Sequence, residues 1–425
     1  MKKSLLFSFM VAGLVMMSSC TKENVIVVGG DDSNAAQQIV LQVANTGDGL
    51  QTRAGRPLYS SEAKQSVENV KVIICNKVDN KVAYVDNIDS WNTVSTAYNT
   101  NGHGREKLLT LKNKLGAGSY VAYAFAYYTG SDYKEIESKI AGVNKEATFT
   151  PNTVLELKDG VKGEEIFAGS VEFDVTKGVG FKRPIVLNRQ VAGTFGYFEA
   201  IPYIEGATKL QLVASTRNQG LVLGQFHNLD LTENGTGYSP YFVVNGANAA
   251  TDKVIYEINL NDWFTSIEDK DKDGLIDTDS WHNAYESNGA KFKNGSVFGG
   301  TFLVPFAKTT EPTFVLKLVK DNGDAVQTWT IKLPETDKQT ANNYTLYSWD
   351  GDKFAENTTA KDEVKIYNVV RNHLYGIGTK TKDGEVVPPE NPDPDTPEPL
   401  KKKQELTLRV NDNWDIIHKL EIEED

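Results

Sequence analysis

Apolar and polar residues alternate along most of this chain in short segments that are separated by turn residues. In the segment VENVKVIIC the alternation places Val70, Val72 and Ile74 on one face of a strand, and after the turn VDNK the segment VAYV returns. Similar alternation occupies residues 208–215 and 313–333, and the turn DNGD interrupts the second of these as in a hairpin. Helical periodicity is scarce, so the pattern predicts an all-β protein built from sandwiches.

Three longer segments are less uniform. The run SYVAYAFAYY (119–128) fits a buried strand, although its alanine content also permits a helix. The segment KRPIVLNRQVAGTFGYFEAIP (182–202) resembles one long strand that Gly193 and Gly196 could bend or bulge, and we expect a domain boundary inside it, near residue 190. The best candidate for a helix is SDYKEIESKI (131–140), which opens with a serine suited to an N-cap.

Composition divides the chain into successive parts. Residues 384–400 contain six prolines among 17 residues, which is typical of an extended, semi-rigid tether. The expected order is a signal peptide (1–19), a propeptide (20–53) with a strand at 37–45, an N-terminal β-sandwich (54–190), a C-terminal β-sandwich (191–383), the tether (384–403) and terminal strands (404–425).

The N-terminus has the features of an export signal. Two lysines precede the apolar run Leu5–Met17, which is too short to span a bilayer and typical of a signal peptide. Two serines then precede Cys20, an arrangement that resembles a bacterial lipobox, in which the cysteine is acylated and becomes the new N-terminus. Acyl chains would hold such a precursor on a membrane. The alternative is ordinary secretory cleavage beside an incidental cysteine.

Charge and cysteine content narrow the classes of function. The net charge of −12 argues against nucleic acid and anionic membrane surfaces as partners, and is otherwise typical of a soluble protein. Cys75 is the only cysteine besides Cys20, so we expect no disulfide framework and interpret Cys75 as a small buried hydrophobe. The chain contains no G-x-S-x-G, H-E-x-x-H or P-loop motif, and its five histidines lack metal-ligand spacing. We therefore predict no enzyme and no required cofactor.

Two segments near opposite ends of the chain share one apolar pattern. QQIVLQVAN (37–45) aligns with QELTLRVND (404–412). The aligned pairs are Ile39 with Leu406, Leu41 with Leu408, Val43 with Val410, Gln37 with Gln404, and Gln42 with Arg409. Alternating aliphatic residues are common in β proteins, so coincidence is one interpretation. The other is that the two strands fill the same groove with the same buried face.

A glycine-rich, polar segment, TGDGLQTRAGRP (46–57), follows the first of these strands, and exposed segments of this kind are preferred sites of proteolysis. Arg56 precedes a proline, a bond that trypsin-like proteases cut poorly, whereas the bond between Arg53 and Ala54 is open to them. Cleavage there would separate the lipid anchor and the strand at 37–45 from the rest of the chain.

The departure of that strand would expose an apolar slot between unpaired strand edges. The tail of another copy could fill this slot by strand addition, with the tether holding the tail away from its own body. Burial of three aliphatic side chains contributes roughly 5–9 kcal/mol before ordering costs. Because head-to-tail joining of this kind does not close on itself, it yields a filament.

These features resemble the Bacteroidetes fimbrillins, the precursors of the major subunits of type V pili. The resemblance covers most of the chain and rests on the lipobox at Cys20, the loop QTRAG, the segments VLNRQVAG, GGTFLVPF and VVRNHLYGI (369–377), the tether, and a last segment in which Trp414 follows a polar break. It implies two transthyretin-like β-sandwich domains in tandem, with an N-terminal removable strand and C-terminal donor strands. It further implies a lipidated outer-membrane precursor, an arginine-specific protease, and polymerisation by strand exchange into surface fimbriae for adhesion and biofilm formation. Other copies of the chain, and tip and anchor subunits, would then be its partners.

The resemblance also implies roles for single residues. Arg53 and Ala54 would form the cleavage site, and Ile39, Leu41 and Val43 the buried face of the removable strand. The anchors of the donor strands would be Leu406, Leu408, Val410, Trp414, Ile416, Leu420 and Ile422. The division of labour between the two terminal strands stays open.

The segment DKDKDGLIDTD (269–279) is a candidate calcium loop. The carboxylates of Asp269, Asp271, Asp273 and Asp277 take the first, third, fifth and ninth positions of such a loop. The carbonyl of Leu275 takes the seventh. The twelfth position is Ser280 rather than glutamate, and no pair of flanking helices is evident. A structural calcium ion and a solvated acidic turn therefore both remain open.

Aromatic residues in loops give an alternative function. Trp263, Trp281, Tyr285 and Tyr238 could stack on sugars, as in a surface lipoprotein that captures glycans, or could cap the core of a sandwich.

Overall fold

A computed structural model describes most of the two predicted sandwiches and short parts of the C-terminal tail. It describes residues 35–43, 67–97, 105–128, 133–158, 165–224, 241–250, 254–286, 291–307, 314–332, 345–349, 354–357, 369–371, 374–378, 380, 396–401, 405–407 and 409–411. Strands dominate this part of the chain and helices are short, which confirms the all-β class. None of its helices is long and apolar enough to cross a membrane.

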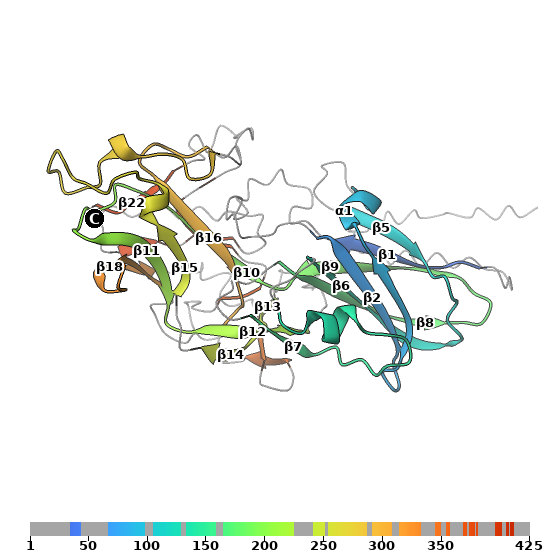
Figure 1. The fold of residues 1–425 in the computed structure, drawn as a ribbon. Coiled ribbons are helices and arrows are strands. Elements are labelled where there is room, and N and C mark those ends of the chain that lie inside the picture. The colour runs from blue at the N-terminus through green and yellow to red at the C-terminus, as the bar shows by residue number, and fades with distance from the viewer. Residues whose placement is uncertain are drawn as a thin grey trace, which may run out of the picture.

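The N-terminal half forms one sheet of eight strands in the order β3-β2-β6-β8-β9-β1-β5-β4 (Figure 1). Its elements are β1 (Gln37–Val43), β2 (Asn69–Asn76), β3 (Val82–Ile88), α1 (Trp91–Val94), β4 (Thr96–Ala97), β5 (Arg105–Thr110), β6 (Gly118–Tyr127), β8 (Phe167–Val175) and β9 (Phe181–Arg189). Only two residue pairs join β8 to β9, Phe167 with Arg189 and Ala168 with Asn188. The sheet therefore folds over at this corner into two layers, β3-β2-β6-β8 and β9-β1-β5-β4.

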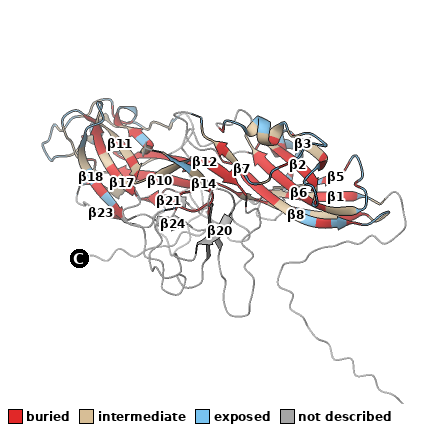
Figure 2. Ribbon diagram, turned by 90° about the horizontal axis from the view of Figure 1, so that it is seen from below, coloured by how far each residue is buried: buried red, intermediate tan, exposed pale blue. Residues whose placement is uncertain are grey.

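A single apolar core fills the space between these layers. Strand β2 contributes Val70, Val72 and Ile74 to it, as the alternation of the sequence predicts. The opposite face of β2 contributes Ile73 and Cys75 to a second core that continues through the C-terminal half. Figure 2 shows the buried residues of both cores in red along the strands. The alanine-rich run expected at 119–128 is the strand β6, and the interpretation as a buried strand is confirmed.

The chain crosses from the N-terminal to the C-terminal sheets at residues 190–191. Strand β9 ends at Arg189, and β10 (Ala192–Glu199) begins a different sheet, so the single long strand expected at 182–202 is wrong. The backbone N–H of Gln190 donates to Ile166 O at 2.8 Å, and Asn245 Nδ2 donates to Gln190 O at 2.7 Å. The first bond continues the β8–β9 register by one residue, and the second gives the Gln190 carbonyl a side-chain partner from outside that ladder.

Buried polar side chains surround this crossing. Arg189 contacts Glu165 Oε1 through Nε at 2.7 Å and Nη2 at 2.6 Å, and both side chains are almost completely buried. Arg371 Nη1 donates to Gln190 Oε1 at 3.2 Å, and burial lowers the pKa of Arg371 to about 10. A buried ion pair of this kind contributes less to stability than its geometry suggests, but the loss of one partner costs a great deal.

The C-terminal half contains two five-stranded sheets. One has the order β16-β10-β21-β24, with β22 also paired to β10, and the other has the order β15-β11-β17-β18-β23. Their strands are β11 (Ala207–Ala214), β15 (Val254–Asn259), β16 (Val297–Leu303), β17 (Phe314–Lys320), β18 (Ala325–Lys332), β21 (Leu374–Ile377), β22 (Glu398–Pro399), β23 (Glu405–Thr407) and β24 (Arg409–Asn411). Strand β11 and the antiparallel pair β17–β18 confirm the strand expected at 208–215 and the hairpin expected at 313–333.

Two small sheets complete the fold, and one of them crosses the expected boundary near residue 190. Its strands are β7 (Thr153–Glu156), β12 (Arg217–Leu223) and β14 (Gly246–Ala250), so residues from both sides of the crossing pair directly. The other contains β13 (Tyr241–Val244), β19 (Thr345–Trp349) and β20 (Phe354–Asn357). The division into two domains therefore stays a prediction.

The helix expected at 131–140 is much shorter in the structure. Only a π-helical turn, η1 (Glu137–Ala141), forms there. The preceding residues pair with β7 instead: Tyr133 bridges Leu157, and Lys134 N–H donates to Glu156 O at 2.7 Å. Ile140 is the buried residue of the turn, and Ile136 packs against the same core from a partly buried position.

Candidate functional site

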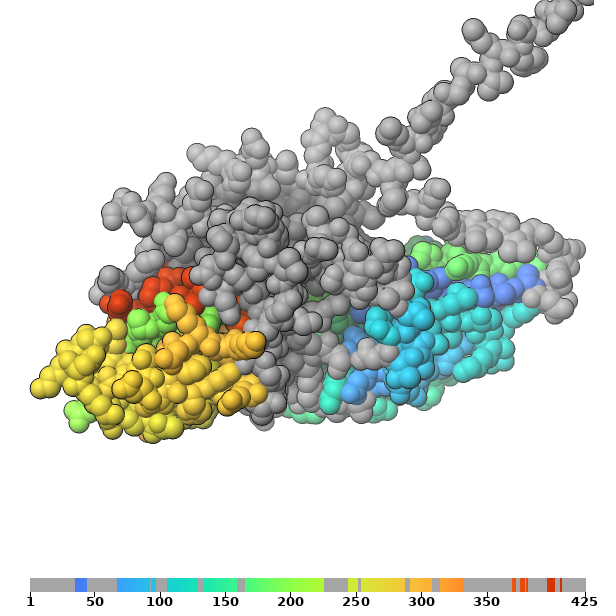
Figure 3. All heavy atoms as spheres, turned by 90° about the horizontal axis from the view of Figure 1, so that it is seen from above, coloured from blue at the N-terminus to red at the C-terminus, as the bar shows by residue number. Residues whose placement is uncertain are grey.

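Strand β1 lies inside its layer rather than at an edge. It runs parallel to β9 and antiparallel to β5, and both ladders extend along nearly its whole length. In Figure 3 the blue atoms of β1 form a band between the green atoms of β9 and the cyan atoms of β5. Parallel strands that are adjacent in space usually belong to βαβ units, but β1 and β9 are separated by more than one hundred residues of antiparallel sheet. The strand is thus inserted between elements that follow it in sequence.

The inward face of β1 is sealed in the core. Ile39 and Leu41 have no exposed surface and Val43 is 7% exposed, so all three residues expected on the buried face lie there. The outward side chains Gln38, Val40 and Gln42 are partly exposed. This alternation is the pattern that the sequence comparison with residues 404–412 rests on.

Gln37 fixes the position of β1 along its groove. Its side-chain Nε2 donates to Leu115 O at 3.1 Å, and its Oε1 accepts the Leu115 N–H at 2.7 Å. The two bonds form a closed ring between a buried side chain and a loop backbone, so a shift of the strand would break both. Sequence reasoning aligned Gln37 with Gln404 but assigned Gln37 no role. Its place directly before an alternating strand was the only available signal.

Removal of β1 would open a well-defined slot. Among the described strands, β5 pairs only with β1 and β4, so without β1 the β5–β4 pair would keep no ladder to the rest of the sheet. Strands β9 and β5 would stand about two strand spacings apart, roughly 9–10 Å, with unpaired backbone groups facing one another. The floor of the slot would be the apolar core that now covers Ile39 and Leu41.

The described part of the C-terminal tail lies on the C-terminal half of the same chain. Strand β23 runs parallel to β18, and Leu406 is completely buried there. Strand β24, which includes Val410, runs antiparallel to β21. The end of the tether is also packed, because Leu400 is buried and its carbonyl accepts a hydrogen bond from Trp329 Nε1 at 3.2 Å.

Several predicted site residues lie outside the described part of the chain. They are Cys20, Arg53, Ala54, Leu408, Trp414, Ile416, Leu420 and Ile422. Their roles in lipidation, cleavage and strand donation stay predictions.

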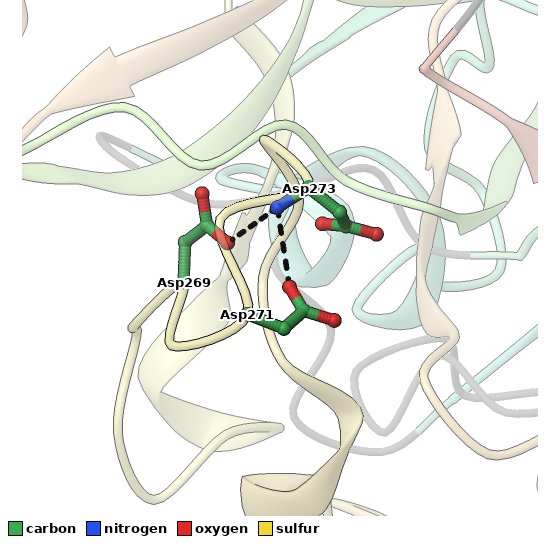
Figure 4. Close-up of side chains that lie close together, drawn as sticks. All are labelled: Asp269, Asp271 and Asp273. Atoms are coloured by element: carbon green, nitrogen blue, oxygen red, sulfur yellow. Dashed lines mark hydrogen bonds between the residues drawn. The ribbon is translucent and has the colours of Figure 1, made fainter.

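Three carboxylates of the candidate calcium loop come together. Asp269, Asp271 and Asp273 each offer an oxygen, and these oxygens lie within 4.8 Å of one another (Figure 4). The N–H of Asp273 donates to Asp269 Oδ1 at 3.1 Å and to Asp271 Oδ1 at 3.2 Å, and Gly274 N–H donates to Asp269 Oδ2 at 3.0 Å. Oxygen-rich clusters of this kind suit Ca²⁺, so the calcium site stays a proposal.

Asp277, another predicted calcium ligand, does not join this group of carboxylates. Its Oδ2 accepts the N–H of Lys270 at 2.9 Å. Leu275 lies beside Pro202 in a β-bridge, and the role of its carbonyl as a ligand stays a prediction. Short 3₁₀ turns, η2 (Leu260–Asp262) and η3 (Thr278–Ser280), lie on the two sides of the loop.

The loop aromatics pack onto the second core. Trp263 is 2% exposed and lies edge-on to Tyr285 and Phe292, with ring centroids 5.4 and 5.2 Å away. Trp281 Nε1 donates to Ser296 O at 2.7 Å. Tyr238 lies outside the described residues. Trp263 therefore caps the core and presents no face on which a sugar could stack.

Comparisons with known proteins found likenesses among solved structures only. The chain matches no protein-family model and no curated protein sequence. It is similar to a fimbrial assembly protein from Parabacteroides distasonis, with 11% identity, a TM-score of 0.37, and coverage of 90% of this chain and 97% of the other. It is also similar to the tip fimbrial protein Mfa3 from Porphyromonas gingivalis (11% identity, TM-score 0.36, 82% and 96% coverage) and to the fimbrial anchor protein Mfa2 from the same organism (10% identity, TM-score 0.35, 76% and 95% coverage).

Proposed function

We propose that this chain is a structural subunit of cell-surface fimbriae, belonging to the shaft. It is exported as a lipoprotein precursor acylated at Cys20, reaches the outer membrane, and is cleaved after Arg53. The cleaved subunit loses β1 and accepts the C-terminal tail of another copy in its place. Repetition of this step builds a filament that supports adhesion and biofilm formation.

The observation that carries this proposal is the placement of β1. Strand β1 is central in its layer and buried on one face, so the precursor requires it. A segment with a cleavable bond after Arg53 follows it, so proteolysis can release it. The tail offers the same apolar spacing as β1, so it can bury the same face in the vacated slot.

The precursor keeps its tail on its own body until assembly. Strands β23 and β24 cover the outer edges of β18 and β21, and Leu406 fills part of the second core. Donation requires these ladders, of which three residues each are described, to open. The slot offers the tail two ladders in exchange, of seven residue pairs along β9 and six along β5.

Limited proteolysis tests this function. The purified precursor is treated with trypsin or an arginine-specific protease, and samples are run on a gel without boiling. We expect a ladder of oligomers whose chains begin at Ala54 by N-terminal sequencing, and no ladder when residues 401–425 are deleted. Cleavage at Arg53 without oligomers, or oligomers that survive this deletion, would contradict the proposal. Mature fimbrial chains that keep residues 20–53 would favour a surface lipoprotein with another role.

A further inference from the structure

The side chains of β5 and β9 that border the β1 slot on its outward face form its rim. This rim carries one acidic and one basic side chain, Glu106 and Lys182, at fixed positions. Glu106 on β5 lies opposite Gln42, and Gln42 Nε2 donates to Glu106 Oε2 at 3.3 Å. Lys182 on β9 lies level with Gln38 in the parallel ladder. In the precursor both charges thus face neutral glutamines of β1. Cross-strand neighbours on one face of a sheet interact, and opposite charges stabilise such pairs.

The tail carries complementary charges at the matching positions. When Leu406 takes the place of Ile39, Glu405 takes the place of Gln38 and Arg409 takes the place of Gln42. Glu405 would then lie beside Lys182, and Arg409 opposite Glu106. We propose that this pair of contacts, Glu405 with Lys182 and Arg409 with Glu106 of the next subunit, selects the direction and strengthens the register in which one copy's tail enters another's slot. The inference rests on the strand exchange proposed above.

A slip of two residues costs the tail part of its apolar burial. It places Gln404 at the position of Ile39, or Asp412 at the position of Val43, so a polar side chain enters the buried face. In either slipped register one charged tail residue would also lie at the position of Val40, between Leu108 and Pro184, where no opposite charge faces it. A slipped register therefore loses apolar burial and charge pairing together.

Insertion in the reverse direction is disfavoured by the same rim. If the tail is turned end for end with Leu408 at the position of Leu41, its three aliphatic side chains stay on the buried face, but Thr407 and Asn411 take the places of Gln42 and Gln38. The tail then brings no charge to the positions that face Glu106 and Lys182. Only the forward register forms both attractive contacts, so the rim favours the forward direction.

The rim also favours the tail over the strand that it replaces. The glutamines of β1 offer only uncharged donors, from Gln42 Nε2 to Glu106 Oε2 and from Gln38 Nε2 to Thr110 Oγ1 at 3.1 Å. Arg409 would bring a charged donor to the Glu106 carboxylate, and pairs in which both partners are charged add Coulomb attraction to the hydrogen bond. A slot filled by Glu405 and Arg409 is thus held more tightly at its rim than a slot filled by β1.

Charge reversal and its repair test the pairing in the protease-processed chain. Arg409→Glu should slow the loss of monomer by about fivefold to tenfold, because one attraction becomes one repulsion. The double variant Glu106→Arg/Arg409→Glu should recover most of the wild-type rate. Glu172→Arg is the matched control, since Glu172 lies on β8 in an exposed pair with Lys77, away from the slot, and should assemble like the wild type.

A disulfide reports the register directly. Thr407 takes the place of Val40, which lies opposite Leu108, so the variant Leu108→Cys/Thr407→Cys should cross-link neighbouring subunits under mild oxidation. The variant Thr110→Cys/Thr407→Cys reports a slip of two residues and should not cross-link. Cys75 is buried and does not compete.

The outcomes separate this inference from strand exchange itself. Two results would overturn the charge pairing and leave strand exchange intact. In one, polymers that require residues 401–425 assemble equally well with Arg409→Glu. In the other, polymers cross-link in the slipped register. A processed wild-type chain that forms no polymer overturns both the charge pairing and strand exchange. Slower assembly by Arg409→Glu with recovery in the double variant, together with the cross-link to position 108, supports the pairing.

Discussion

Leu41→Ala should destabilise the precursor and leave the stability of the processed polymer unchanged. Leu41 is completely buried at the centre of β1 in the N-terminal core. Truncation of a buried leucine to alanine costs about 2–5 kcal/mol, and we take about 3 kcal/mol for a site closed on both sides by neighbouring strands. For a unit of this size each kcal/mol lowers Tm by about 2–4 °C, so the unfolding transition of the precursor should fall by about 6–12 °C. In the processed polymer the residue has been cut away, so the variant should match the wild type.

Differential scanning calorimetry of the precursor and of the processed polymer measures both quantities. Val40→Ala is the control, because Val40 belongs to the same strand but points outward, and its truncation should cost about 1 kcal/mol or less. A Leu41→Ala precursor that melts like the control would show that β1 is not packed as described. A polymer with the same loss of stability as the precursor would show that β1 stays in its groove, and the reasoning on strand exchange would be refuted.

Further predictions concern the rest of the molecule. Burial raises the pKa of the Cys75 thiol to about 12. At pH 8.5 iodoacetamide should therefore alkylate Cys75 in the folded chain on the order of 10³-fold more slowly than in the denatured chain. Mass spectrometry measures both rates, and equal rates would contradict the burial. Glu165→Ala leaves Arg189 buried without its carboxylate and should lower the free energy of unfolding by about 3–5 kcal/mol in denaturant titrations, against about 1 kcal/mol or less for Glu172→Ala at an exposed pair. Calorimetric titration should detect Ca²⁺ with a Kd of about 0.1–1 mM that Asp271→Asn weakens, and no binding by the wild type would remove the calcium proposal.

Much of the fold can be predicted from periodicity. Alternation identified β2, β3, β11 and the β17–β18 hairpin. The same alternation identified the buried face of β1. That residues 37–45 and 404–412 share one groove stays a prediction. These features depend on local spacing alone.

Other features depend on contacts between distant residues and leave no local pattern. The segment 182–202 reads as one strand, yet Gln190 and its buried partners Asn245 and Arg371 divide it between two sheets. The expected helix at 131–140 shortens because Tyr133 joins a β-bridge 24 positions along the chain. Neither partner can be found by counting apolar positions, since tertiary hydrogen bonds override local preference.

The arrangement around β1 also required the structure. Alternation shows that β1 has a buried face, but it does not show that β9 and β5 flank it or that β9 runs parallel to it. The clamp from Gln37 to Leu115 and the rim charges Glu106 and Lys182 become visible only when the ladder registers are known. Likewise, a proline-rich tether indicates a detached tail, whereas the described part of the tail lies on β18 and β21.

A cryo-electron microscopy map of native filaments, at a resolution that distinguishes side chains, tests strand exchange most directly. The account predicts that each slot between β9 and β5 holds residues 404–410 of the neighbouring subunit, with Leu406 at the position of Ile39, and that residues 20–53 are absent. Density for residues 37–43 of the same chain in that slot would contradict it.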